Sequence, residues 1–433
     1  MEKTKVFQNK EKQQKIKEVA LKILFTLGIF LVYKICTMIP AVKGVELFSS
    51  DEAQGFIGII NSFTGDSLRT YSIIALGVSP YITASIIVEL LEMDIIPVLA
   101  EWKEEGEEGR KKLSQLTRYL GIIVAFIQAI GTTFGMKDQI FQYQRTSFIG
   151  LMAVVITLTA GSALCIWFAD LITQYGVGNG TSLLIAMGII ISLPGSIKSL
   201  INDISGQNVA FAKYLSAAFS LLLFFAVIIG IVFMEASQRK IQIQYSNRPG
   251  AAKFRGSSES VFPIKLNSAS VIPVIFASTL MGIPLTIISY AGLYNSNPTA
   301  YNWLYQIFSS SSILGYVIYV LLIFFFSIFY TFLQINPQKT AEDLQKRGAY
   351  IPGYRPGYET EQYLSKTIFN VTLFGAIYLV VIASLPTFAT MLGASSSIEV
   401  GGTSMMIVVG VAIETWRQIK ADAQEQKYAG FLA

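Results

Sequence analysis

Nearly uncharged apolar runs of about 20 residues recur along the chain, and a helix of that length crosses the hydrocarbon core of a bilayer. These runs lie at roughly 18–40, 71–92, 117–135, 148–169, 179–194, 214–234, 269–290, 313–333, 367–387 and 402–418. Only 14% of the residues are charged, whereas soluble proteins average roughly a quarter. The sequence therefore predicts an all-α integral membrane protein with about ten transmembrane helices.

The basic residues are distributed unevenly between the two sides of the membrane that these spans define. Twenty-six Lys and Arg residues fall in the two termini and in the loops on the same side, against six in the opposite loops. Loops rich in Lys and Arg remain in the cytoplasm. We therefore expect a multi-pass protein with both termini cytoplasmic, which an even number of spans requires.

The composition disfavours catalytic chemistry. The chain has no histidine, and histidine is the commonest general base and the commonest transition-metal ligand. The two cysteines, Cys36 and Cys165, each lie inside an apolar run, which favours two buried free thiols over a disulfide. We predict no catalytic residue, no metal site and no cofactor, so the chain is not expected to be an enzyme.

A segment between the first two spans fits neither an external loop nor a span. Residues 56–69 read FIGIINSFTGDSLR, which is apolar enough to avoid water but too short to cross the membrane. Two placements are compatible with it: an amphipathic helix on the outer surface, or a short helix folded back into the bundle. Irregular backbone at membrane depth requires burial in protein or a cavity to line. In the second placement, Gly65 supplies a flexible break before the second span.

Small and polar residues are concentrated in the second, fifth and seventh spans. A single residue of this kind indicates close helix packing. Their concentration in three spans favours helices that face one another across a hydrated space. Glu89, in the second span, is costly in lipid, so we expect it to face the interior or to lie near the cytoplasmic end.

The loop after the sixth span predicts a β-hairpin. Apolar and polar residues alternate in two runs, 241–246 and 262–267, and a period of two is typical of strands. The tip between the runs carries Arg248, Lys253 and Arg255 among turn residues. Two roles fit such a basic finger: a solvated loop, or a docking surface for ribosomal RNA or an acidic protein patch.

The loop after the eighth span combines a short helix with a stiff turn. Residues 339–347 have helical character and end at Gly348, and the turn-rich stretch 352–357 then presents Arg355. An arginine on a rigid scaffold suits partner recognition, because rigidity lowers the ordering cost of binding. An ordinary connecting loop is the alternative.

Seven ordered sequence motifs carry a resemblance to a known family. They are ALGVSPYITASIIVELL at 75–91, EEGEEGRKKLSQLTRYL at 104–120, YGVGNGTSLLI at 175–185, EASQRKIQIQYSNR at 235–248, FPIKLNSASVIPVIFAS at 262–278, FLQINPQKTAEDLQKRGAYIPGYRPG at 332–357 and GGTSMMIVVGVAIET at 401–415. From about Lys22 to Leu432 the chain resembles the SecY/Sec61α translocon subunits, and specifically bacterial SecY proteins.

The resemblance implies a fold of two inverted five-helix halves around a central pore, with a short re-entrant plug helix and a cytoplasmic β-hairpin finger. The implied segments are a cytoplasmic tail at 1–17, an N-terminal half at 18–194 with the plug at about 56–70, an external hinge loop at 195–213, a C-terminal half at 214–418 with cytoplasmic loops at 235–268 and 334–366, and a cytoplasmic tail at 419–433.

The resemblance also assigns roles to individual residues. The pore ring would consist of Val78, Ile82, Thr181, Ile185, Ile275 and Ile407, and the plug would include Asn61, Phe63, Gly65, Asp66 and Leu68. The lateral gate would include Ser79, Thr83, Glu89 and Ser278, and partners would dock on Arg239, Arg248, Lys253, Arg255 and Arg355. Thr181, Asp66 and Glu89 depart from the family's usual aliphatic residue, glycine and glutamine, respectively.

The function implied is that of the channel-forming subunit of the Sec translocase in the bacterial plasma membrane. The implied partners are SecE, SecG, the SecA ATPase, the ribosome with possible ribosomal RNA contact, secretory polypeptides and the lipid bilayer. An accessory SecY paralogue with dedicated substrates stays open as an alternative. A secondary solute transporter is less favoured because only Lys34 and Glu89 are charged well inside the spans. An intramembrane hydrolase lacks a nucleophile–base pair.

Overall fold

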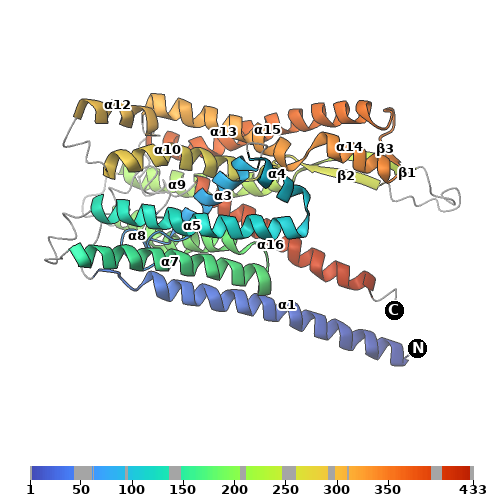
Figure 1. Cartoon of the computed structure of the whole chain (residues 1–433), viewed down its shortest axis with the longest axis horizontal. Helices are drawn as coiled ribbons and strands as arrows, with labels where there is room; N and C mark the ends of the chain where they lie inside the picture. The colour runs from blue at the N-terminus through green and yellow to red at the C-terminus, as the bar shows by residue number, and fades with distance from the viewer. Residues whose placement is uncertain are drawn as a thin grey trace.

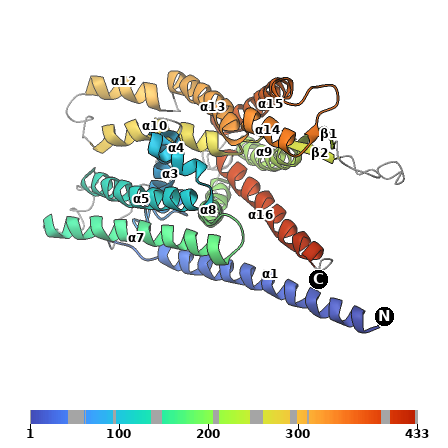
Figure 2. The same ribbon diagram turned by 45° about the vertical axis from the view of Figure 1, so that its right-hand side comes forward.

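The computed structural model describes residues 2–42, 61, 63–92, 96–135, 148–204, 211–245, 260–290, 298–309, 312–391 and 402–429. Most of these residues form helices that lie side by side along one axis (Figure 1). The start of the first helix, the end of the last helix and a small β-sheet lie at one end of this bundle, and a second view shows the same arrangement (Figure 2).

Each predicted span overlaps one helix of the bundle. These helices are α1 (Glu2–Thr37), α3 (Ser79–Leu91), α5 (Glu107–Gly135), α7 (Phe148–Tyr175), α8 (Gly180–Ile204), α9 (Phe211–Ala236), α10 (Ile272–Tyr290), α13 (Ile313–Gln334), α15 (Tyr358–Met391) and α16 (Gly402–Ala429). Among the described residues, five helical stretches are long and apolar enough to cross a membrane, and four shorter apolar helices accompany them. The exact number of crossings stays a prediction.

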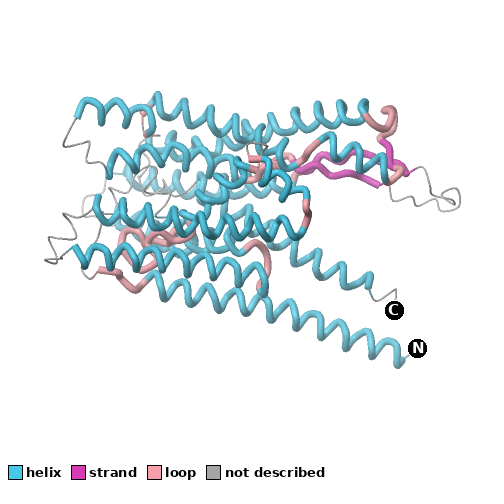
Figure 3. The backbone as a smooth tube through the Cα atoms, in the orientation of Figure 1, coloured by secondary structure: helices cyan, strands magenta, loops and turns pink. Residues whose placement is uncertain are grey.

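The second span begins later than the sequence predicts. Its helix α3 starts at Ser79 instead of at 71, and the preceding residues from 64 to 78 form turns (Figure 3). Tyr71 and Gly77 adopt positive φ angles of 46° and 54°, which a right-handed helix excludes. The turn segment instead pairs with the chain that follows α1, since the Ala41 amide donates to the Tyr71 carbonyl at 2.8 Å.

The fifth span ends later than expected. Helix α8 continues through Pro194 to Ile204, and α9 begins at Phe211. Much of the expected hinge loop at 195–213 is therefore helical, and residues 205–210 lie outside the described residues. The proline ring removes one backbone donor, but a helix in a bundle tolerates this loss because neighbouring groups satisfy the freed carbonyl.

The predicted hairpin is present and belongs to a larger module that two loops build together. Strand β1 (Gln238–Tyr245) pairs antiparallel with β2 (Ser260–Lys265), and β1 also pairs with β3 (Ala349–Tyr350) from the loop after α13. The sheet order is therefore β2-β1-β3. The sequence pattern does not predict this third strand, which joins two loops that lie about a hundred residues apart in the chain.

A shared apolar core holds this module to the bundle. The sheet contributes Ile241, Ile243 and Ile264, and α15 contributes Leu364, Ile368 and Val371. Helix α14 (Pro337–Lys346) adds Ala341 and Leu344 from the second loop, and its first turn is capped by the Asn336 side chain, which accepts hydrogen bonds from two backbone amides. The two shorter helices α4 (Pro97–Glu104) and α12 (Pro298–Phe308) complete the described structure.

We expect Leu364→Ala to loosen the sheet without unfolding the bundle. Leu364 is fully buried in the module core, and truncating a buried leucine costs about 2–5 kcal/mol. Amide hydrogen exchange in β1, measured in detergent micelles, should become faster. Tyr358→Ala is the control, because Tyr358 is 71% exposed. Equal exchange in the parent protein and in Leu364→Ala would show that α15 does not support the sheet.

Candidate pore and gate

Four of the predicted ring residues belong to one large apolar cluster or pack against it. Ile185 on α8 and Ile407 on α16 are 6% and 3% exposed within this cluster. Ile82 on α3 and Ile275 on α10 are partly buried and pack against it. Four helices that are distant in sequence therefore each bring one branched aliphatic side chain to the same place.

The other two predicted ring residues lie beside this cluster. Val78, the residue before α3, packs in a neighbouring apolar cluster with Tyr33 and Leu184. Thr181 is half-buried in the first turn of α8, where its backbone amide donates to the Asn179 side chain at 3.0 Å. The arrangement thus brings together Ile82, Ile185, Ile275 and Ile407, and it places Val78 and Thr181 outside their cluster.

The expected plug segment reaches the same cluster. Phe63 packs against it, and Leu68 is 6% exposed in a third apolar cluster with Val42 and Leu158. These side chains point into protein, which favours the folded-back placement over a helix lying on the membrane surface. Residues 56–60 and 62 lie outside the described residues.

The Asn61 side chain braces the plug segment internally. Its amide nitrogen donates to a carboxylate oxygen of Asp66 at 2.8 Å, and its amide oxygen accepts from the Arg69 backbone at 3.1 Å. Gly65 and Asp66 both have left-handed backbone conformations, with φ of 67° and 62°. Aspartate is one of the few residues other than glycine that adopt this conformation readily. The Gly65-Asp66 pair therefore forms a turn that Asn61 closes.

Helix α8 touches the backbone of the plug segment directly. A side chain at Gly188 would place its Cβ 2.0 Å from the Phe63 carbonyl oxygen, and one at Gly65 would lie 3.1 Å from Ile191. Only a glycine at 188 permits this approach. The sequence alone does not single out Gly188, because a glycine within an apolar span indicates close packing without identifying the partner.

Two of the predicted gate hydroxyls, those of Thr83 and Ser278, are buried and bond to their own helices, whereas Ser79 is half-buried. Thr83 donates to the Ser79 carbonyl at 3.2 Å, and Ser278 donates to the Val274 carbonyl at 2.8 Å. The Ser278 hydroxyl also lies 3.4 Å from the Tyr319 hydroxyl on α13, a contact that the sequence did not indicate. Each of these two bonds satisfies a buried hydroxyl within its own helix, so neither hydroxyl needs a partner on the other helix.

Glu89 is half-buried near the end of α3, as expected from the cost of a carboxylate in lipid. The Ser85 hydroxyl approaches one of its carboxylate oxygens at 3.4 Å. The other carboxylate oxygen is buried and has no hydrogen-bond partner among the described residues. One turn further along the chain, Glu92 forms an ion pair with Lys103 of α4 at 2.7 Å.

Two of the predicted docking arginines are described, and both are exposed. Arg239 lies in β1, and Arg355 lies in the turn between β3 and α15. The Thr360 hydroxyl donates to the Arg355 carbonyl at 2.8 Å. The tilted rings of Tyr354 and Tyr363 pack beside the turn, with their centroids 4.3 Å apart. The backbone that presents Arg355 is therefore held in place. Arg248, Lys253 and Arg255 lie outside the described residues.

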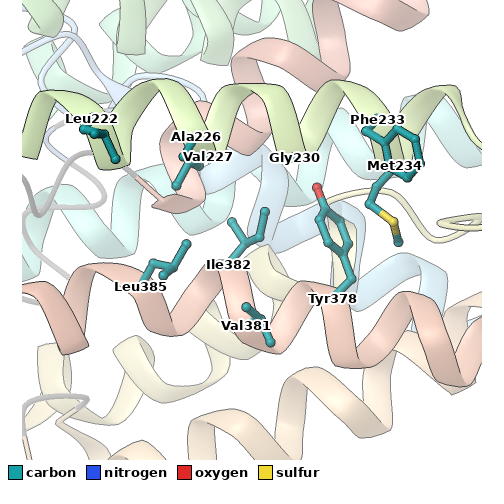
Figure 4. A pocket seen from close by; sticks show the side chains of 10 residues that line it. All are labelled: Leu222, Ala226, Val227, Gly230, Phe233, Met234, Tyr378, Val381, Ile382 and Leu385. Atoms are coloured by element: carbon teal, nitrogen blue, oxygen red, sulfur yellow. The ribbon is translucent and has the colours of Figure 1, made fainter.

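An apolar cavity of about 400 Å³ lies between α9 and α15, away from the predicted ring residues (Figure 4). Val227 and Ile382 from its lining also belong to the central cluster. The Tyr378 hydroxyl points toward α9 from among these apolar side chains. None of the lining residues that the structure describes is charged.

The sequence is similar to those of known proteins. The sequence model of the SecY family matches residues 72–416, which include the loops after α9 and α13 and the four clustered residues of the predicted ring. The chain belongs to the SecY family. Protein translocase subunit SecY of Staphylococcus epidermidis is 42% identical over 430 residues, covering 96% of this chain and 97% of that protein.

Solved structures of SecY-type channels share the fold of this SecY family member. A protein-conducting channel superimposes with a TM-score of 0.68 at 20% identity, covering 94% of this chain and 93% of the other. Sec61 in a canine ribosome–channel complex from the endoplasmic reticulum superimposes with a TM-score of 0.63 at 19% identity, with the same coverage of both chains. The α-helical membrane fold expected from the sequence is confirmed.

We expect Gly188→Ala to displace the plug segment from α8. The added methyl would overlap the Phe63 carbonyl, and relief requires movement of the plug backbone. Resting ion conductance in planar lipid bilayers should rise above that of the parent. Gly230→Ala on α9 is the matched control, since nothing lies within 4 Å of a Cβ there. Equal conductance of the two variants would contradict the close contact.

Proposed function

We propose that this chain is the central channel-forming subunit of the Sec protein translocase in a bacterial plasma membrane. It passes unfolded secretory polypeptides across the membrane and releases transmembrane segments sideways into lipid. The observation that carries the proposal is the meeting of Ile82, Ile185, Ile275 and Ile407 from four helices in one cluster with Phe63. No catalytic step is required of the chain itself.

The apolar ring acts as a seal that yields to a passing chain. Branched aliphatic side chains exclude water and ions from a narrow constriction without forming specific bonds. A translocating polypeptide pushes these side chains aside and meets no hydrogen bond that would bind one sequence more tightly than another. The Phe63 side chain fills the space beside the ring while no polypeptide is present.

Sideways release requires α3 and α10 to separate. Ile82 of α3 and Ile275 of α10 both pack against the central apolar cluster, and the hydroxyls of Thr83 and Ser278 bond within their own helices. A separation of the two helices breaks neither the Thr83 bond nor the Ser278 bond, because each lies within one helix. In this proposal the inverted halves, spans one to five and six to ten, hinge around the connection between α8 and α9.

The partners of this subunit dock on the β2-β1-β3 sheet and the turn that presents Arg355. Exposed arginines suit the phosphates of ribosomal RNA or an acidic surface of the SecA motor. Both termini and this docking surface are cytoplasmic, supported by the excess of Lys and Arg in these segments and by their common end of the bundle (Figure 1). SecE and SecG complete the translocase within the membrane.

The proposal is tested by disulfide crosslinking of a stalled secretory chain that carries one cysteine. Single cysteines at Ile82→Cys and Ile275→Cys are placed in a background in which Cys36 and Cys165 are replaced by serine. Ile123→Cys is the control, because Ile123 is 54% exposed on the outer face of α5. Crosslinks at 82 and 275, with none at 123, are expected. No crosslink at either ring position, with SecA active, would favour a solute transporter.

We also expect Arg355→Glu to slow SecA-dependent export more than co-translational membrane insertion. The substitution reverses a charge on a turn whose backbone is held by Thr360, so the local structure should survive while an acidic partner is repelled. The rates are compared in inverted membrane vesicles for an exported precursor and a polytopic membrane protein. Arg347→Glu, an exposed arginine in the same loop, is the control. An equal loss of both activities would remove Arg355 from the motor interface.

A further inference from the structure

A buried carboxylate at the end of α9 has no part in the ring, the plug or the docking turn. Glu235 is 6% exposed, and its side-chain oxygen accepts a hydrogen bond at 3.0 Å from the Asn267 amide, which is 3% exposed. The Arg417 guanidinium donates to the Glu235 carbonyl oxygen at 2.7 Å. Burying a carboxylate is unfavourable unless it is paired, so this cluster marks a position where three segments must stay together.

The cluster lies where the finger strands leave the bundle. The β1–β2 ladder ends with Gln238 opposite Lys265, and the Leu266 amide continues it by donating to the Ser237 carbonyl at 3.2 Å. The Glu235–Asn267 bond is the next contact toward the membrane. The strands emerge directly from the end of α9 (Figure 2). Hydrogen bonds thus run without a break from the finger into the bundle.

Asn267 and Arg417 connect the cluster to two ring helices. A short turn joins Asn267 to the start of α10, on which Ile275 lies, and within this turn Ser270 has a strained φ of 54°. Arg417 is on α16, ten residues from Ile407, a helical rise of about 15 Å. A backbone contact also fixes the turn from the side, since a Cβ at Gly375 would lie 2.7 Å from the Leu266 carbonyl oxygen.

We infer that Glu235 is a positioning residue that couples the orientation of the finger to the closed arrangement of α10 and α16. This inference rests on the function proposed above. With the Glu235–Asn267 bond in place, the entry to α10 is held against α9 and α16. A partner that tilts the finger pulls on this bond, and α10 is released toward the open gate only when the partner is docked.

The charges around the cluster favour this role. Burial disfavours the charged form of the Glu235 carboxylate, the Asn267 hydrogen bond and the charges of Lys265 and Arg417 favour it, and the charge of Glu414 opposes it. Lys265 is the last residue of β2, so the finger contributes a charge to the cluster as well as a ladder of hydrogen bonds. Moving the finger therefore changes the electrostatic environment of Glu235 and the geometry of its hydrogen bond together.

A reversal of the hydrogen bond tests the coupling. Asn267→Asp places two carboxylates face to face, whereas Glu235→Gln/Asn267→Asp restores one bond with donor and acceptor exchanged. Without a partner, Asn267→Asp should raise the open probability in planar bilayers by about tenfold, as expected for the loss of a charge-assisted hydrogen bond. The double variant should return to within about twofold of the parent.

The second measurement is the opening of the channel when a partner is added. A merely structural role for Glu235 would leave this response unchanged. Addition of SecA with a precursor should open the parent and the double variant, and should add little to channels of Asn267→Asp that are already open. If Asn267→Asp does not accumulate in the membrane, Asn267→Leu removes the donor at similar volume and should behave in the same way. The inference would be overturned if the single variants were as closed at rest as the parent. It would also be overturned if the double variant were as open as Asn267→Asp.

Crosslinking separates this inference from the proposed function. When Ile82→Cys is combined with each of these variants, the stalled precursor should form a disulfide at position 82 in every case. If every variant forms the crosslink and all variants are equally closed at rest, the coupling is rejected but the channel proposal stands. Absence of the crosslink in the parent background rejects the channel proposal itself.

Discussion

The backbone of a membrane protein must satisfy its hydrogen bonds without water, and this requirement explains the least regular part of the structure. Residues 64–78 form turns in a chain whose other apolar stretches are helical. Such a segment is stable at membrane depth only when protein surrounds it. Here its amides and carbonyls pair with one another and with the chain after α1, while Asn61 and Asp66 close the turn from their side chains.

The same burial gives the centre of the bundle two opposing properties. Apolar contacts among Ile82, Ile185, Ile275, Ile407 and Phe63 exclude water, but they are not directional, so side chains repack without a fixed energetic penalty for any one arrangement. The polar contacts are placed elsewhere: in the plug turn, within single gate helices, and at the base of the finger. In the proposed channel, an apolar seal is thus enclosed by polar contacts of fixed geometry, and movement at these contacts would determine when the seal opens.

Much of this organisation could be predicted from the sequence because it depends on local patterns. Apolar length located each long helix of the bundle, period-two alternation located β1 and β2, and motif matches located the four clustered ring residues. The errors fall where tertiary contacts override local preference. Residues 71–78 are as apolar as a helix, but Tyr71 and Gly77 have positive φ angles because the segment packs against α1 and the plug.

Other features could not be read from the sequence, since they join segments that carry no local signal of each other. Strand β3 has two residues, too few for a detectable alternation. The bond between Glu235 and Asn267 spans 32 positions, and each residue alone resembles an ordinary polar residue at a helix end. Gly188 is one glycine among 34, and only the position of Phe63 gives it a specific role.

The pairing of β3 with β1 makes the loop after α9 and the loop after α13 a single unit of exchange. A β1–β2 hairpin transferred from a relative would lose its pairing with β3 and its apolar contacts with α14 and α15. It would keep them only if the loop after α13 and the start of α15 were transferred with it. Chimeras divided between these loops would then fail for reasons of packing, even where each loop alone matched its new partner. The natural boundary for recombination lies outside both loops, in the helices that carry them.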